Sequence, residues 1–143
     1  MMFKKLIEML TGGGDTIRDG VQIDKPIPVD AYTSSASGLE IADLKLGSGA
    51  AAAKGNQATV HYTGWLTTGK RFDSSAVKSK PFTFTVGARK VIKGWDEGVE
   101  GMKVGGVRQL RVPAALGYGQ RGHPPRIPQS ATLIFEIELL AVK

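Results

Sequence analysis

The stretch "KGWDEGVEGM", residues 93–102, decides the fold because a helical period here interrupts a chain of strand-like segments. Trp95, Val99 and Met102 fall at i, i+4 and i+7, which places them on one face of a helix. Acidic residues stand in its first turn, where the helix dipole favours them. Glycines at positions 101, 105 and 106 offer places for it to end. A helix this short is not stable alone, so its apolar face has to pack on a sheet.

Five segments around the helix alternate between apolar and polar residues as strands do: 39–46, 58–66, 81–87, 107–113 and 131–142. The last shows the pattern most clearly, with one face formed by Leu133, Phe135, Ile137 and Leu139 and the other by Glu136 and Glu138. A slip in the first segment predicts a bulge, and Thr68 with Gly69 predicts a turn after the second. We therefore expect an α+β fold in which a curved antiparallel sheet wraps around one short helix.

The first 36 residues differ from the rest. "MMFKKLIEML" spaces its apolar residues, from Phe3 to Leu10, as a short amphipathic helix, and a glycine run follows it as a flexible joint. Residues 24–38 are typical of an extended linker. The segment is either a docking arm or dimerisation helix or a loosely held terminus. A secretory signal fits less well, because an acidic residue interrupts the short apolar stretch. We predict an N-terminal extension over 1–36 and one domain over 37–143.

Composition sets broad limits on the function. The chain has 143 residues, of which 41% are hydrophobic, enough for one domain with a real core. It has no cysteine, which excludes disulfides, cysteine-ligated zinc and a thiol nucleophile. No run of about 18 apolar residues is present to span a membrane. The net charge is +6, but basic residues are spread singly, which favours a positively biased soluble surface over a nucleic-acid site. We expect a cytoplasmic protein, with the periplasm as the alternative.

The sequence "FDSS" at 72–75 raises the alternative of a serine hydrolase. A serine nucleophile needs a base within hydrogen-bond reach, an orienting group and an oxyanion hole. The chain has two histidines, His61 and His123, and neither Ser74 nor Ser75 lies in a Gly-x-Ser-x-Gly elbow. The sequence therefore argues against a serine hydrolase.

Two further chemistries find little support. "SAVK" at 75–78 matches a Ser-x-x-Lys dyad, but it lacks companion motifs. The histidines and carboxylates show no metal-ligand spacing. We expect Ser74 and Ser75 to make local hydrogen bonds that shape the turn after Phe72.

Six aromatic residues come from different predicted elements: Tyr62, Phe72, Phe82, Trp95, Tyr118 and Phe135. Periodicity alone favours an ordinary hydrophobic core for them. Their sequence context indicates more. Four motifs follow one another in order: "VHYTGWLTTGKRFDSS" (60–75), "VIKGWDEGVEGMKVGG" (91–106), "LGYGQRGHPPRIP" (116–128) and "ATLIFEIELL" (131–140). Together they make residues 37–143 closely resemble the FK506-binding-protein family of peptidyl-prolyl cis–trans isomerases.

The resemblance implies a five- to six-stranded antiparallel half-barrel around a short helix. By the same resemblance the catalytic set would comprise Tyr62, Phe72, Asp73, Trp95, Tyr118 and Phe135. Further contacts to substrate or macrolide would come from Phe82, Val91, Ile92, His123 and Ile127. Trp95 would form the floor of the pocket, Tyr118 would donate its hydroxyl to a substrate carbonyl, and the backbone N–H of Ile92 would be a second ligand donor.

An isomerase of this kind needs no nucleophile. Rotation about a prolyl bond is limited by lost amide resonance, and an apolar pocket disfavours the polar planar state relative to the twisted one. We therefore expect no cofactor and no metal. The expected partners are proline-containing polypeptides during folding and FK506- or rapamycin-type macrolides, with partner docking through residues 1–36. The alternative is a non-catalytic chaperone or adaptor module of the same fold.

Four positions depart from the usual pattern of the family: Lys78 near Asp73, where Arg is common; Lys90, where acidic or polar residues are common; Arg126, where an apolar residue or Gly is frequent; and Gln129, where Pro is frequent. Lysine cannot form the bidentate pair that arginine forms with a carboxylate. The substitutions are either neutral surface changes or parts of a more positive pocket rim. A positive rim would favour substrates with acidic residues near the proline.

Overall fold

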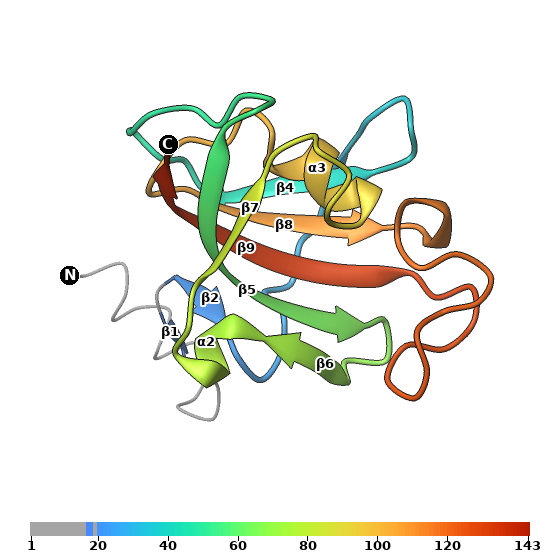
Figure 1. The fold of residues 1–143 in the computed structure, drawn as a ribbon. Helices are drawn as coiled ribbons and strands as arrows, with labels where there is room; N and C mark the ends of the chain where they lie inside the picture. The colour runs from blue at the N-terminus through green and yellow to red at the C-terminus, as the bar shows by residue number, and fades with distance from the viewer. Residues whose placement is uncertain (1–16, 19) are drawn as a thin grey trace.

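The computed structural model describes residues 17–18 and 20–143, which contain an open antiparallel sheet with a short helix, α3 (Lys93–Val99), packed across one face (Figure 1). The strands of this sheet run in the order β3-β4-β8-β9-β5-β6, and β7 pairs with β5 beside β6. Their bounds are Thr33–Ser34 for β3, Glu40–Lys45 for β4, Gln57–Leu66 for β5, Arg71–Ser74 for β6, Phe82–Thr85 for β7, Val107–Val112 for β8 and Leu133–Val142 for β9. β1 (Ile17–Arg18) and β2 (Val21–Gln22) form a separate pair.

The expected α+β architecture is confirmed, and the sheet is open rather than a closed barrel. It has seven strands where five to six were expected, because the two-residue β3 adds to the edge at β4. The predicted bulge is present as a register shift between Asp43 and Lys45. The predicted turn closes the β5–β6 hairpin, where the Gly69 N–H donates to Leu66 O and Gly69 has a φ of 92°.

The core lies between α3 and one face of the sheet. Trp95, Val99 and Met102 from the helix segment are 5%, 0% and 3% exposed. They join buried residues of β5, β8 and β9 in one cluster, among them Leu110 and Phe135. The helix ends as predicted by its glycine, since Gly101 has a φ of 88° and the Met102 N–H donates back to Val99 O.

Glycines in α3 let the helix lie close to the sheet. A Cβ on Gly98 would stand 2.5 Å from Leu110 Cδ1, and one on Gly94 would stand 2.7 Å from Val112 Cγ1. Both distances are too short for real carbon atoms, so larger residues would push α3 away from β8. The close approach fixes the depth at which Trp95 enters the core.

β6 and β7 share one edge of β5. β7 pairs with residues 57–60 and β6 with residues 63–65. Between them lies a single helical turn, α2 (Ser75–Lys78), whose first turn is capped by Ser74 Oγ accepting from the Val77 N–H at 3.2 Å. A 3-10 turn, η1 (Ala114–Leu116), opens the long loop that joins β8 to β9. This layout brings the ends of β6, α3 and the long loop to one side of the molecule (Figure 1).

The opposite face of the sheet is covered by residues 20–34, which we call the N-terminal strap (blue in Figure 1). Val21 is fully buried against Ala76 and Val107. The Gln22 and Ile27 N–H groups donate to the buried carboxylate of Glu136 at 3.1 and 2.6 Å. Of these strap residues, Ile27 lies within residues 24–38, which sequence patterns described as a linker, and it is bonded to the sheet.

Two expectations for the N-terminal part stay open. The amphipathic helix expected over residues 1–10 lies outside the described residues, and the domain boundary at 36/37 stays a prediction. Within the described part of the chain, every helix is too short or too polar to cross a membrane.

Candidate functional site

Aromatic rings from four strands and one helix meet around Trp95. The Trp95 ring lies edge-on to Tyr62 at 4.8 Å, to Phe135 at 5.4 Å and to Phe82 at 6.0 Å between centroids. Phe72 adds a further edge-on contact to Phe135 at 5.5 Å. Such geometries are the favoured ones for aromatic pairs. We call these five residues the aromatic site.

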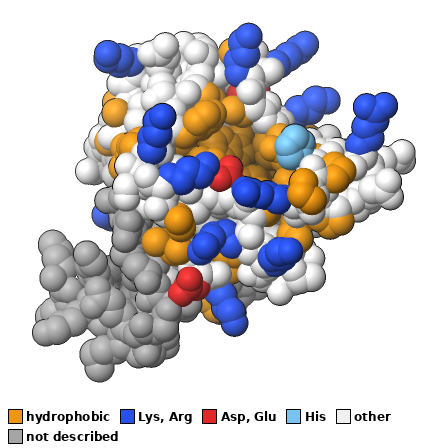
Figure 2. All heavy atoms as spheres, turned by 60° about the horizontal axis from the view of Figure 1, so that its bottom comes forward, with side chains coloured by type: hydrophobic (Ala, Val, Ile, Leu, Met, Phe, Trp, Pro, Cys, Tyr) orange, Lys and Arg blue, Asp and Glu red, His pale blue; other side chains and the backbone are white. Residues whose placement is uncertain are grey.

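Part of this set is open to solvent, which distinguishes it from an ordinary core. Phe82 is 39% exposed, and Tyr62 and Phe72 are partly exposed, while Trp95 and Phe135 are 5% and 3% exposed. Figure 2 shows a face of the molecule where hydrophobic side chains line a hollow bordered by Lys and Arg. The structure therefore brings Trp95, the expected floor of the pocket, together with the other four residues of the aromatic site, which form its walls.

A glycine makes room for Phe72. On β5, Gly64 faces β6, and a Cβ there would stand 2.6 Å from Phe72 Cζ and 2.8 Å from Phe135 Cε1. The absence of a side chain at this position lets the two phenylalanine rings meet over the strand. Any larger residue at position 64 would displace a wall of the site.

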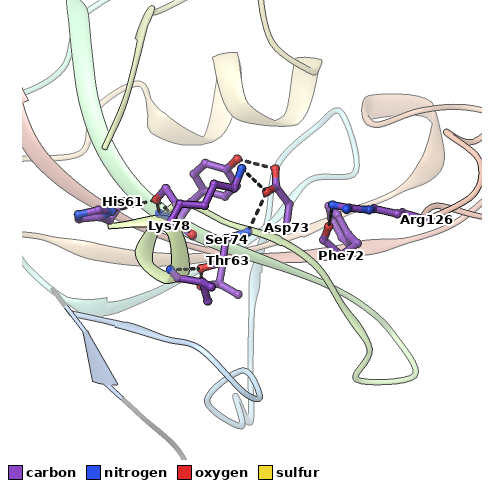
Figure 3. A network of polar contacts seen from close by, with 10 residues as sticks. His61, Thr63, Phe72, Asp73, Ser74, Lys78 and Arg126 are labelled. Carbon is purple, nitrogen blue, oxygen red and sulfur yellow. Dashed lines mark hydrogen bonds and ion pairs between the residues drawn. The ribbon is translucent and has the colours of Figure 1, made fainter. Parts of the chain in front are cut away.

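The carboxylate of Asp73 lies at the edge of the aromatic site, next to Tyr62. Its Oδ2 accepts from the Tyr62 hydroxyl at 2.5 Å, and its Oδ1 accepts from the Ser74 N–H at 2.9 Å and pairs with Lys78 Nζ at 3.0 Å (Figure 3). Burial raises the pKa of Asp73. The hydrogen bonds from Tyr62 and Lys78, together with the Lys78 charge, lower the pKa by more than burial raises it, so the net shift is downward. Asp73 therefore remains a carboxylate that holds Tyr62 in place.

The tyrosine hydroxyls stay protonated. Burial raises the pKa of Tyr62, and its hydrogen bond to Asp73 raises it further. Burial also raises the pKa of Tyr118, and the negative charge of Asp73 adds to this effect. Both hydroxyls are thus donors rather than bases at neutral pH.

The long loop between β8 and β9 supplies the remaining expected residues. His123 and Ile127 exchange backbone hydrogen bonds at 2.9 and 3.0 Å, which closes the loop on itself. The Tyr118 ring packs against His123 at 5.2 Å. Ile127 is 3% exposed and joins the core cluster that contains Trp95. The loop is therefore anchored at Ile127 and presents the half-exposed Tyr118.

Val91 and Ile92 lead into α3 and pack against the same cluster. Ile92 O accepts from the Trp95 and Asp96 N–H groups at 3.0 and 3.3 Å, which sets the start of the helix. The Ile92 N–H donates to no group within the described residues. The buried Trp95 Nε1 likewise has no hydrogen-bond partner in that part of the chain. Two donors at the start of α3 are thus unused by the part of the chain that the structure describes.

One ring of the cluster was absent from the predicted site. Phe84 lies 5.6 Å from Trp95 and 6.0 Å from Phe82, stacked on the latter. It is 6% exposed, so it supports the floor from below rather than facing a ligand. The alternation along β7, which places both phenylalanines on one face, is the signal that identifies it.

The serines have the structural role expected of them. Ser75 Oγ accepts from the Tyr62 N–H at 2.7 Å and lies 2.9 Å from His61 Nδ1, and Ser74 Oγ lies 2.9 Å from Thr63 Oγ1 (Figure 3). Ser75 and His61 are 2% and 5% exposed. A serine closed off in this way does not reach a substrate carbonyl, so the contact with His61 is structural.

Comparisons with known proteins agree with this geometry. A family model described as FKBP-type peptidyl-prolyl cis-trans isomerase matches residues 48–140. The FK506-binding protein of Neisseria meningitidis serogroup B is 56% identical over 105 residues, which cover 73% of this chain and 96% of that protein. The human peptidyl-prolyl cis-trans isomerase FKBP2 is 52% identical over 90 residues, which cover 63% of each chain.

Solved structures show the same fold. The crystal structure of AtFKBP13 superposes with a TM-score of 0.74 at 41% identity and covers 79% of this chain and 99% of that one. FkpA from Escherichia coli also gives a TM-score of 0.74, at 37% identity, over 80% of this chain but only 53% of its own.

Proposed function

Because the chain belongs to the FKBP-type peptidyl-prolyl cis-trans isomerase family, we propose that it accelerates rotation about prolyl bonds in polypeptides at the aromatic site, and thereby assists protein folding. One observation carries the proposal. Four aromatic rings gather around a nearly buried tryptophan, yet Phe82, Tyr62 and Phe72 keep part of their surface exposed to a ligand. A purely structural core would bury these rings.

The chemistry follows from the electronic structure of the amide. The barrier to rotation is about 18–20 kcal/mol and reflects lost resonance between nitrogen and carbonyl. The twisted amide is less dipolar than the planar one, so a site that excludes water disfavours the planar state more. Each 1.4 kcal/mol, approximately, removed from this barrier gives tenfold in rate. No bond to the protein forms in such a mechanism.

Named residues take separate parts in it. The Trp95 ring supplies a flat apolar surface for the prolyl ring, and Phe72 and Phe135 close the sides. Tyr118, which is 38% exposed, offers its hydroxyl to a substrate carbonyl. The Ile92 N–H is a second donor at the start of α3. Asp73 fixes Tyr62 through the 2.5 Å hydrogen bond and remains ionised.

The same surface suits a macrolide inhibitor. A FK506- or rapamycin-type macrolide presents an apolar ring flanked by carbonyl groups, which matches an apolar hollow with a few donors at its edge. We infer that such a molecule competes with the prolyl substrate.

The test is the cis-to-trans rate of a short proline-containing peptide, measured by exchange NMR with and without the protein. We expect a rate increase proportional to protein concentration, and its loss when FK506 is added. A proline-limited refolding reaction measured in parallel should also accelerate. Peptide binding without any rate increase would contradict the proposal and favour the non-catalytic module. Catalysis that FK506 leaves unchanged would refute the inferred macrolide binding.

A further inference from the structure

The two chain segments next to the aromatic site are rich in basic residues and poor in acidic ones. Beyond these segments, Asp96 on α3 places its carboxylate on the Gly87 and Arg89 N–H groups. The two segments, residues 70–93 and 117–128, contain one acidic residue, Asp73. Their basic residues are Lys70, Arg71, Lys78, Lys80, Arg89, Lys90, Lys93, Arg121 and Arg126. The whole chain is far more balanced, with 19 basic and 13 acidic residues. The positive charge is therefore concentrated next to the site, as the Lys and Arg side chains around the hollow in Figure 2 illustrate.

The negative charge of the one carboxylate in these segments, Asp73, is already balanced by a lysine. Asp73 pairs with Lys78 Nζ at 3.0 Å and accepts hydrogen bonds from Tyr62 and Ser74. Arg71 reaches Asp24 of the N-terminal strap at 3.9 Å. The other basic residues of the two segments make no ion pair within the described part of the chain. We call six of these residues the basic rim: Lys80, Arg89, Lys90, Lys93, Arg121 and Arg126.

Arg126 is the member of the basic rim that the structure holds against the site. Its Nη1 donates to Phe72 O at 3.1 Å, so its guanidinium lies over β6 beside an aromatic wall (Figure 3). A guanidinium carries five N–H donors in one plane, and this contact uses one nitrogen. The remaining donors can take a carboxylate, which arginine binds with two parallel hydrogen bonds.

We propose that this site prefers polypeptide segments in which an acidic residue adjoins the proline, with Arg126 binding the acidic side chain and the basic rim attracting it. The inference rests on the proposed function, because it concerns which prolyl substrates that site accepts. An unpaired positive rim around an apolar floor repels basic flanking residues and attracts acidic ones. Lys78 does not share this role, since its charge is matched by Asp73.

The size of the preference follows from exposure. The basic rim is open to water, so each ion pair with a substrate contributes little. Salt weakens the attraction further, because at 0.1 M ionic strength exposed charges more than about 10 Å apart are largely screened. An exposed pair changes an equilibrium about two- to fivefold. We expect a preference of that order at low salt and a smaller one at high salt.

The experiment compares peptides that differ at one residue next to the proline. Glu, Gln and Lys are placed before the proline in one series and after it in a second, and each catalysed rate is referred to its own uncatalysed rate. We expect the Glu peptide to exceed the Gln peptide about two- to fivefold in kcat/KM in at least one series, and the Lys peptide to fall below both. The ratio of Glu to Gln should decline as salt is added.

Variants assign the preference to a residue. Arg126→Gln should bring the ratio of Glu to Gln close to one in the series that shows it. Lys45→Gln is the matched control, because Lys45 is an exposed lysine on β4, on the far side of β8 and β9 from β5 and β6. It should leave the ratio as in the wild type.

Each outcome is decisive. Equal rates for Glu, Gln and Lys peptides from an active protein at low salt would overturn the inferred preference while leaving the isomerase intact. A full preference retained in Arg126→Gln would overturn the assignment to Arg126. No acceleration of any peptide by the wild type would instead contradict the proposed function.

Discussion

Asp73 shows how one carboxylate can order a site without acting as a base. All three groups that contact it are donors or cations: the Tyr62 hydroxyl, the Ser74 N–H and Lys78. These contacts stabilise the anion more than burial destabilises it, so the pKa is lowered. A carboxylate held ionised in this way is a weak proton acceptor. Its effect is to orient Tyr62, whose ring lies 4.8 Å from Trp95.

The lowered pKa of Asp73 predicts a pH dependence of stability. A group whose pKa is lower in the folded state stabilises the fold above its unfolded pKa, and this stabilisation is lost as the pH falls through the folded pKa. Asp73→Asn should therefore reduce the free energy of unfolding by about 1 kcal/mol at neutral pH, since the site is partly screened by solvent. The difference from the wild type should shrink below about pH 4.

Urea denaturation of both proteins at a series of pH values measures this difference. Titration of the other carboxylates affects both proteins alike and cancels. A difference that grows toward acid pH would mean that the Asp73 contacts do not stabilise its anion.

Single residues also show where sequence reasoning succeeded. Hydrogen bonding by Ser74 and Ser75 was predictable, because serine next to a turn commonly bonds nearby backbone. The bond from the Val77 N–H to Ser74 Oγ, three positions apart, is of this kind. The contact between Ser75 and His61, in contrast, spans two elements and follows from the pairing of β5 with β6 and α2. No local pattern identifies it.

At the scale of elements, the N-terminal strap and β9 form one buried polar unit. Glu136 on β9 is fully buried and accepts from the Gln22 and Ile27 N–H groups. Gln109 on β8 donates to Glu136 at 3.0 Å and to Ile27 O at 2.8 Å, and it accepts from the Tyr32 hydroxyl. Burial raises the pKa of Glu136, while these donors oppose the rise. The hydrogen bonds to the Glu136 carboxylate thus hold the strap on the sheet, and each donor helps to stabilise the buried carboxylate.

Replacing that carboxylate should loosen the N-terminal strap. In Glu136→Gln, an amide NH₂ group takes the place of one acceptor oxygen and faces an N–H donor. We expect the free energy of unfolding to fall by about 1–3 kcal/mol, the usual effect of leaving a buried donor unsatisfied. Hydrogen exchange at Gln22 and Ile27 should accelerate at the same time.

Glu40→Gln is the control, because Glu40 makes an exposed ion pair with Arg111 at 3.6 Å. Its effect should stay below about 1 kcal/mol. If the Glu136 variant were as stable as the wild type, with unchanged exchange at Gln22 and Ile27, the strap would not depend on this contact.

Local periodicity predicted the elements that it governs and missed those that depend on distant partners. The helix at 93–99 and the strands β4, β5, β7, β8 and β9 follow from patterns within ten residues or so. The two-residue β3 and the single turn α2 are too short to leave a pattern. The alternation in β9 correctly separated Glu136 from the core face. Its burial arises from contacts 109 and 114 positions away in the sequence, which no local pattern contains.

At the scale of the whole molecule, the site exists because the sheet topology joins distant segments. Tyr62 on β5, Phe72 on β6, Phe82 on β7 and Phe135 on β9 converge because these three strands all neighbour β5. The α3 helix then adds Trp95 from above the sheet. Residue patterns alone indicated only a core for these rings, and the order of the four motifs indicated the site. The solvent exposure of Phe82 and Tyr118 depends on the folded arrangement and follows from no sequence pattern.

We propose that desolvation by the aromatic site, and not the buried contact between Ser75 and His61, drives prolyl isomerisation. The most direct test is the catalysed cis-to-trans rate of one proline peptide with wild-type, Phe72→Ala and Ser75→Ala proteins, each shown to be folded. We predict a kcat/KM at least about tenfold lower for Phe72→Ala and within about threefold of the wild type for Ser75→Ala. Loss of catalysis in the serine variant, with full activity in the phenylalanine variant, would contradict this mechanism.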